Sequence, residues 1–145
     1  MSRVDFYLLE SNEPRQRQLY ACRLTEKAYR LGHSIYIHTA SPAQTQAMDE
    51  LLWTFRQGSF IPHCSSDQSD VEPVVPVVVG HGSAPARMND LLINLNPEVV
   101  SNFASFQRIA ELVDQDEPVR QAGRQRYRLY QEAGIEIKTH KVAVN

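Results

Sequence analysis

Cysteine and long apolar runs are scarce in this chain. It has two cysteines in 145 residues, Cys22 and Cys64, without the spacing of a metal site. We therefore expect free thiols in a reducing compartment and a cytoplasmic location. No apolar run approaches the ~20 residues that cross a bilayer. No basic stretch followed by an apolar one opens the sequence, so we expect neither a membrane span nor a signal peptide.

A marked excess of one charge is also missing. The sequence has 15 Lys and Arg against 17 Asp and Glu, which gives a net charge of -2. The protein as a whole therefore does not attract nucleic acid, and an anionic partner has to be met by a local patch. The length and the 42% hydrophobic content suit one globular domain that spans residues 1–145.

Segments typical of strands and of helices alternate along the chain. We expect strands at 4–9, 34–38, 74–79, 91–95 and 108–113, and helices at 13–31, 41–55 and 118–133. This order predicts an α/β fold of three layers, with a mostly parallel five-stranded sheet and helices on both faces, Rossmann-like but without a nucleotide. Pro76 places its strand at an edge or delays its start to Val77. Residues 65–73 are expected to form a surface loop, and residues 135–145 a short edge segment or a loose tail.

No pattern of catalytic residues is definite. The stretch Gly80-His-Gly-Ser-Ala-Pro85 lacks the Lys-Ser/Thr pair of a Walker loop and the third glycine of a dinucleotide fingerprint. We read residues 80–88 as a connecting loop and assign it no role. His38 and His81 both follow strands whose ends could face a common crevice. A small nucleotide-binding protein or enzyme that uses this crevice stays open as an alternative, although we expect no catalytic, cofactor-binding or metal-binding residues.

Large apolar residues are concentrated in residues 49–63. This segment holds the only tryptophan, Trp53, and after it Phe55, Phe60 and Ile61. A helix end and a tight turn bury aromatic rings readily on one side only. Rings that remain exposed usually mark a surface for another protein. The segment therefore predicts a protein-binding surface.

The last predicted helix carries a basic stripe. Arg120, Arg124 and Arg128 recur at every fourth position, with Tyr127 and Gln131 beside them. Two interpretations stay open. One is a solvated basic face, and the other is an anion site in which guanidinium groups bind carboxylates and the tyrosine ring packs on an apolar group. The opposite face is expected to be core and consists of Val119, Ala122, Leu129, Tyr130 and Ala133.

Arg126 falls in the middle of that core-facing side. A buried guanidinium group has to be paired with a carboxylate or with main-chain carbonyls. We expect Asp114, Asp90 or main-chain carbonyls as its partners, and a structural role.

Taken together, several motifs of this chain resemble the chi subunit of bacterial DNA polymerase III. They follow one another over nearly the whole length and are Val4-Asp-Phe-Tyr-Leu-Leu9, Leu51-Leu-Trp-Thr-Phe55 with Ser59-Phe-Ile-Pro-His63, Asp90-Leu-Leu-Ile-Asn-Leu95, and Arg124-Gln-Arg-Tyr-Arg-Leu-Tyr130 before Ala133-Gly134. The resemblance implies a non-catalytic accessory subunit of the holoenzyme, with no direct nucleic-acid binding. Such a subunit bridges the clamp loader, through the psi subunit, to the acidic C-terminal tail of single-stranded DNA-binding protein.

The resemblance also implies two sets of site residues. The psi-facing surface falls on Trp53, Phe55, Phe60 and Pro62. The tail pocket falls on Val113, Arg124, Tyr127 and Arg128. After His63 the chain reads Cys-Ser-Ser-Asp in place of an Asn-Leu-Ala-Gly-like continuation. An alternative protein on the same face, for example a helicase, therefore stays open as the partner.

Overall fold

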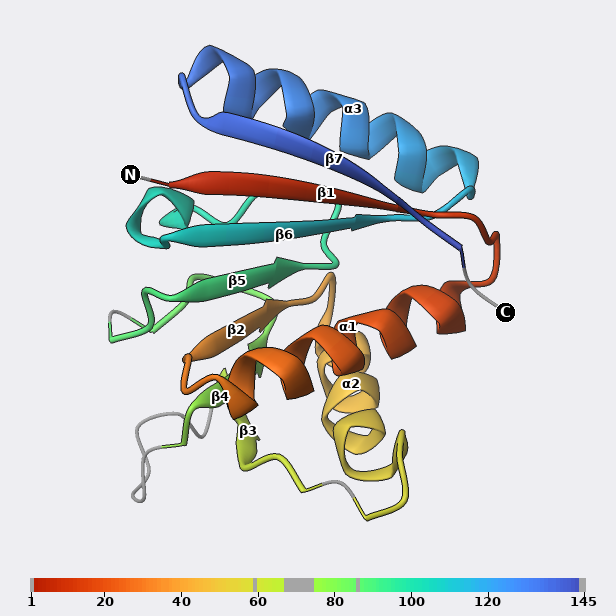
Figure 1. Ribbon diagram of the computed structural model, residues 1–145, viewed down its shortest axis with the longest axis vertical. Coiled ribbons are helices and arrows are strands. Elements are labelled where there is room, and N and C mark those ends of the chain that lie inside the picture. Colours follow the sequence, from red (N-terminus) through yellow and green to blue (C-terminus); the bar gives the residue numbers. More distant parts are fainter. Residues whose placement is uncertain (1, 59, 67–74, 86, 144–145) are drawn as a thin grey trace.

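One parallel sheet organises the protein. The computed structural model describes residues 2–58, 60–66, 75–85 and 87–143, and its sheet has the strand order β3-β4-β2-β5-β6-β1-β7 (Figure 1). Every neighbouring pair of strands is parallel. The strands are β1 (Arg3–Leu9), β2 (Ile35–His38), β3 (His63–Ser65), β4 (Val77–Gly80), β5 (Leu91–Asn94), β6 (Arg108–Val113) and β7 (Glu136–Val142). The helices are α1 (Pro14–Arg30), α2 (Pro42–Thr54) and α3 (Glu117–Glu132), with a short 3₁₀ turn at Phe103–Ser105.

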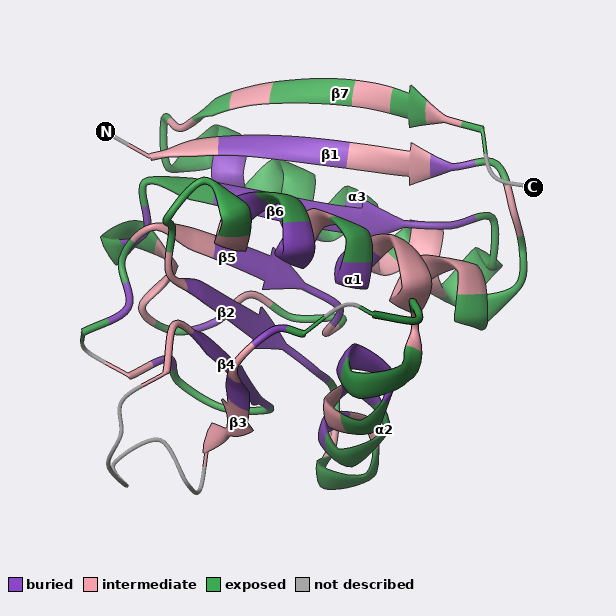
Figure 2. Cartoon of the chain, turned by 60° about the horizontal axis from the view of Figure 1, so that its bottom comes forward, coloured by how far each residue is buried: buried purple, intermediate pink, exposed green. Residues whose placement is uncertain are grey.

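Helices cover both faces of this sheet, so the expected three-layer α/β fold is confirmed. In Figure 2, α1 and α2 lie in front of the sheet and α3 lies behind it. Successive residues of a strand point to opposite faces. Ile35 and Ile37 accordingly pack in the core beneath α1 and α2, whereas Tyr36 between them packs in the core that includes Tyr130 of α3.

The sheet has two strands more than the five expected. The C-terminal segment forms β7, which pairs with the whole length of β1 from Arg3↔Glu136 to Leu9↔Val142, so a loose tail is excluded for these residues. The other additional strand is β3, of three residues. Strand β4 starts at Val77, so the delayed start predicted from Pro76 is confirmed. It lies between β3 and β2, so the alternative of an edge position is wrong. Most of the predicted surface loop, residues 67–73, lies outside the described residues.

The helix boundaries follow local signals. Ser41 caps α2, because its side-chain oxygen accepts a hydrogen bond from the Gln44 amide at 3.2 Å, and Pro42 follows at the first helical position. Helix α1 ends before Gly32, whose φ of +88° is in the left-handed region. Leu31, expected as the last residue of this helix, is its C-cap and is 67% exposed.

A buried carboxylate ties the edge strand β7 to the sheet. Asp5 of β1 is 1% exposed and accepts hydrogen bonds from Arg3 (3.0 Å), Arg108 of β6 (2.9 Å) and His140 of β7 (2.8 Å). Burial by itself would raise the pKa of Asp5, but these hydrogen bonds more than offset it and lower the pKa from 3.8 to about 2.

Acid should weaken the fold through Asp5. A carboxyl group with a lowered pKa stabilises the folded state above its unfolded pKa, and this stabilisation is lost as the pH falls from 3.8 towards 2. The free energy of unfolding lost on protonation of Asp5 amounts to about 2 kcal/mol. Urea unfolding of the wild type and of Asp5→Asn over this pH range measures this loss. The wild type should lose more stability than the variant, and parallel pH profiles would refute the role of Asp5.

Candidate functional site

A hollow lies between α3 and the strands of one edge of the sheet. Its volume is about 480 Å³, and it is lined by residues of β1, β6 and β7 on one side and of α3 on the other. The residues that the resemblance assigned to a peptide tail all line it: Val113, Arg124, Tyr127 and Arg128. The fold therefore brings these four side chains together.

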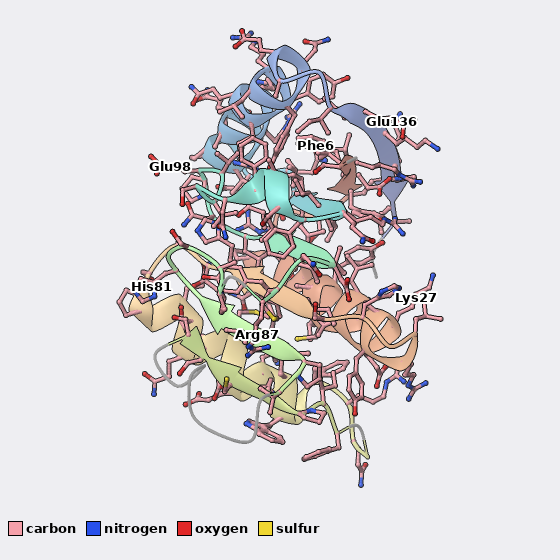
Figure 3. The ribbon with its side chains drawn as sticks, turned by 90° about the vertical axis from the view of Figure 1, so that its left-hand side faces the viewer. Phe6, Lys27, His81, Arg87, Glu98 and Glu136 are labelled. Carbon is pink, nitrogen blue, oxygen red and sulfur yellow. The ribbon has the colours of Figure 1, made fainter. Side chains whose placement is uncertain are left out.

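The floor of this hollow is apolar. Phe6 of β1 is buried, and its ring lies 5.4 Å from that of Tyr127, which is 38% exposed. Figure 3 shows Phe6 close to α3, in the part of the molecule that α3 and β7 enclose. Gly123 allows α3 to approach β6 closely, because a Cβ atom there would lie 3.0 Å from Cγ2 of Val113. An apolar side chain of a ligand can thus reach Val113 and the two rings.

The rim of the hollow is cationic. Arg120 and Arg124 reach Glu117 only at 3.7 and 3.8 Å, with half-exposed side chains, so these ion pairs contribute little to stability. Arg128 is exposed and makes no ion pair with any described residue. The guanidinium groups are therefore available to carboxylates of a ligand.

The inner side of α3 differs in part from the expected one. Val119 and Ala122 are half-buried and Tyr130 is buried, but Leu129 is 39% exposed and Ala133 is also exposed. The fully buried residues of the helix are Gly123, Arg126 and Tyr130, spaced three and four apart. Leu129 and Ala133 lie beside this narrow line of contact, so their assignment to the core is wrong.

Arg126 is buried as expected, but its carboxylate partner is a different one. Its Nε donates to Oε1 of Glu111 at 2.8 Å, and its Nη1 donates to the Pro97 carbonyl at 2.8 Å. The expected bond to a main-chain carbonyl is confirmed, whereas the prediction of Asp114 or Asp90 as the carboxylate partner is wrong.

Glu111 is the residue that the sequence analysis missed. Its carboxylate is fully buried and also accepts hydrogen bonds from Tyr130 (2.6 Å) and Asn94 (2.9 Å). Burial raises the pKa of Glu111, and the charge of Arg126 opposes that rise. The sequence does contain a signal for it: an acidic residue inside the otherwise apolar strand β6. A carboxylate buried there needs a cation beside it.

An exposed aromatic face lies at the opposite edge of the sheet, around the end of α2 and β3. Trp53 is 46% exposed and Phe60 is 65% exposed, and their rings lie 5.4 Å apart. Pro62 is half-buried, and Phe55 packs against the core beneath α1 and α2. The Trp53 ring rests on His63 at 4.3 Å. The expected surplus of exposed rings is thus present at Trp53 and Phe60, which with Pro62 we call the aromatic face.

His38 is the last residue of β2 and His81 follows the neighbouring strand β4, but the two side chains have separate partners. His38 is buried, and its ring nitrogens contact Asn94 at 2.9 Å and Asn96 at 3.3 Å. Burial lowers the pKa of His38. His81 is exposed (Figure 3) and contacts Thr45 at 3.3 Å. Both rings are thus held by neighbouring side chains.

The loop after β4 packs on the sheet. The Tyr36 hydroxyl donates to the Gly82 carbonyl at 2.7 Å, and Ala84 and Met88 are buried in the core on the α3 side. A Cβ atom at Gly80 would lie 2.6 Å from Ser66 and from the Tyr36 hydroxyl, so this position requires glycine. The described part of residues 80–88 therefore has a structural role.

No helix in the described ranges is long and apolar enough to cross a membrane. The same ranges contain no group of three or more His, Cys, Asp and Glu side chains placed to hold a metal ion.

Comparison with known proteins gives consistent matches. Residues 1–138 match the family model described as DNA polymerase III chi subunit, HolC. The DNA polymerase III subunit chi of Pseudomonas aeruginosa is 43% identical over 142 residues, which cover 98% of each chain. The subunit chi of Haemophilus influenzae is 30% identical over 139 residues (96% of each chain), and that of Escherichia coli is 22% identical over 143 residues (96% of this chain and 97% of the other).

The fold also resembles that of a solved structure. A chain in the crystal structure of T4 UvsW superposes with a TM-score of 0.65 over 97% of this chain and 41% of that one. The two sequences are 8% identical, so the likeness concerns the fold alone.

Proposed function

The chain belongs to the DNA polymerase III chi subunit family, and from that premise we propose that it bridges the clamp loader to single strands coated by single-stranded DNA-binding protein. The aromatic face binds a psi-type subunit of the clamp loader. The hollow under α3 binds the acidic C-terminal tail of single-stranded DNA-binding protein. The protein acts in the cytoplasm, without catalysing a reaction and without contacting DNA itself.

One observation carries this proposal: Val113, Arg124, Tyr127 and Arg128 converge on a single hollow. A peptide tail that ends in acidic residues, an apolar side chain and a free carboxylate needs cations beside an apolar floor. Arginine suits the carboxylates, because its planar fork can donate two parallel hydrogen bonds. Salt should weaken this contact, since it is largely ionic.

The positions of the two surfaces support bridging. The aromatic face lies near β3 and the hollow lies beside β7, which are the two edge strands of the sheet (Figure 1). Partners of moderate size can therefore bind at the same time. Two linked contacts strengthen one another through effective concentration, so each can be modest in affinity.

Trp53→Ala should weaken binding of the psi-type subunit roughly 30-fold or more, the usual effect of losing an aromatic anchor. The measurement is isothermal titration of the full chain with the purified psi-type subunit. Leu129→Ala is the matched control, because Leu129 is also a large exposed apolar residue but lies outside both surfaces.

Circular dichroism of the variant excludes unfolding as the cause. If Trp53→Ala unfolds the protein, Phe60→Ala takes its place, since Phe60 is 65% exposed. Wild-type affinity in a folded Trp53→Ala or Phe60→Ala variant would refute the aromatic face as the docking surface.

A further inference from the structure

A second basic hollow lies beside the C-terminal half of α1. Its volume is about 380 Å³, and four cationic side chains line it: Arg23, Lys27 and Arg30 of α1, and Arg56 just after α2. The exposed side chain of Leu31 forms part of its rim. Figure 3 shows Lys27 projecting outward from α1. This concentration of positive charge contrasts with the net charge of -2 of the whole chain.

A buried carboxylate organises half of this hollow. Glu26 is 6% exposed and pairs with Arg56 at 3.0 Å and with Arg30 at 3.5 Å. It therefore fixes two guanidinium groups that come from different elements. The side chains of Arg23 and Lys27 are exposed and have no ion pair or hydrogen bond with any described residue. Two cations are thus held in place, and two remain free to bind a ligand.

Stability of the helix does not explain this arrangement. Lys27 and Arg30 lie in the last turn of α1, where cations are favoured by the helix dipole. Arg23 lies outside that turn, and it faces Lys27 at the i,i+4 spacing at which like charges destabilise a helix by about 0.2–0.5 kcal/mol. Arg56 belongs to another part of the chain. The Arg23–Lys27 pair therefore lowers stability slightly, and the helix dipole offers Arg23 no compensation.

The hollow borders the aromatic face. Arg56 follows Trp53 by three residues, and Phe55 between them keeps helical dihedral angles (φ -66°, ψ -23°). Residues three apart on a helix lie on the same side. Arg56 of the cationic cluster thus lies near Trp53 of the aromatic face, at the end of α2.

We propose that this hollow binds an acidic segment of the same protein that docks on the aromatic face. Arg23 and Lys27 bind its carboxylates together with Arg30 and Arg56, and Leu31 contacts an apolar side chain next to them. The inference rests on the proposed function and defines the chemistry of that partner, an apolar anchor followed by Asp and Glu residues. A single nucleic-acid strand fits less well, because Trp53 and Phe60 pack on each other instead of offering separate platforms to successive bases.

A double charge reversal tests this inference. Arg23→Glu with Lys27→Glu should weaken binding of the psi-type subunit roughly tenfold at low salt and flatten the salt dependence of its affinity. The control pair, Arg15→Glu with Lys138→Glu, makes the same change in net charge at two exposed positions outside the hollow. It should leave the affinity within about twofold of the wild type, because exposed charges far from the binding surface contribute little.

The outcomes separate this inference from the proposed function. Wild-type affinity of the Arg23/Lys27 double variant, while Trp53→Ala loses binding, would overturn the inference alone. Wild-type affinity of both variants would overturn the proposed function as well. The double variant is also titrated with the acidic tail peptide and with bare single-stranded DNA. Unchanged affinity for the psi-type subunit with weaker binding of either probe would reassign the hollow to that probe and overturn the inference.

Discussion

Arg126→Ala is expected to lower the free energy of unfolding by roughly 3–5 kcal/mol, the range for removing one partner of a buried ion pair. The substitution leaves the carboxylate of Glu111, which is 0% exposed, without its cation. It also frees the Pro97 carbonyl, which accepts from Arg126 at 2.8 Å. Tyr130 and Asn94 still donate to Glu111, but neither carries a compensating charge.

Urea unfolding near neutral pH measures this loss. The matched control is Arg124→Ala, two residues away on the same helix, whose side chain is exposed and forms only a long ion pair. Its effect should stay within about 0.5 kcal/mol. Because burial raises the pKa of Glu111, the Arg126→Ala variant should recover stability as the pH falls and Glu111 takes up a proton. Equal losses in the two variants would contradict the structural role of Arg126.

Arg128→Ala is expected to weaken binding of the acidic tail peptide by about 10- to 100-fold, the equivalent of one charge-assisted hydrogen bond of about 1.5–3 kcal/mol. Arg128 has no ion pair with any described residue, so its loss should not destabilise the fold. Fluorescence anisotropy with a labelled tail peptide gives the affinity, and thermal unfolding gives the stability.

Arg15→Ala is the control for this second variant. Arg15 is exposed on α1, and it lies outside the hollow under α3. Arg15→Ala lowers the net charge of the protein by the same amount as Arg128→Ala, so it controls for non-specific attraction of an acidic peptide. Equal affinities of Arg128→Ala and Arg15→Ala would show that the tail binds elsewhere.

The fold was largely predictable because its strands have clear local signals. Strand β6 covers Arg108–Val113, the same residues as the prediction, and its apolar run is buried on both faces. Strand β7 was left open, because Glu136–Val142 has only two apolar residues, Ile137 and Val142, and is mostly exposed. Its position depends on contacts between residues far apart in sequence, such as His140 with Asp5. Periodicity within one segment cannot show such contacts.

The site was predictable in its charged half and less so in its apolar half. The spacing of Arg120, Arg124 and Arg128 indicated a basic stripe, which was either a solvated face or an anion site. The floor depends on the order of the strands, which places β1 between β6 and β7 and so brings Phe6 and Thr139 to α3. The helical wheel misplaced Leu129 because only a narrow line of α3 touches the sheet.

The most direct test of bridging is capture of the psi-type subunit on an immobilised tail peptide. The proposed function predicts capture only when the full chain is added. Capture should be lost with Arg128→Ala, which releases the tail, and with Trp53→Ala, which releases the psi-type subunit. Capture without the chain, or mutually exclusive binding of the two partners, would contradict the bridge.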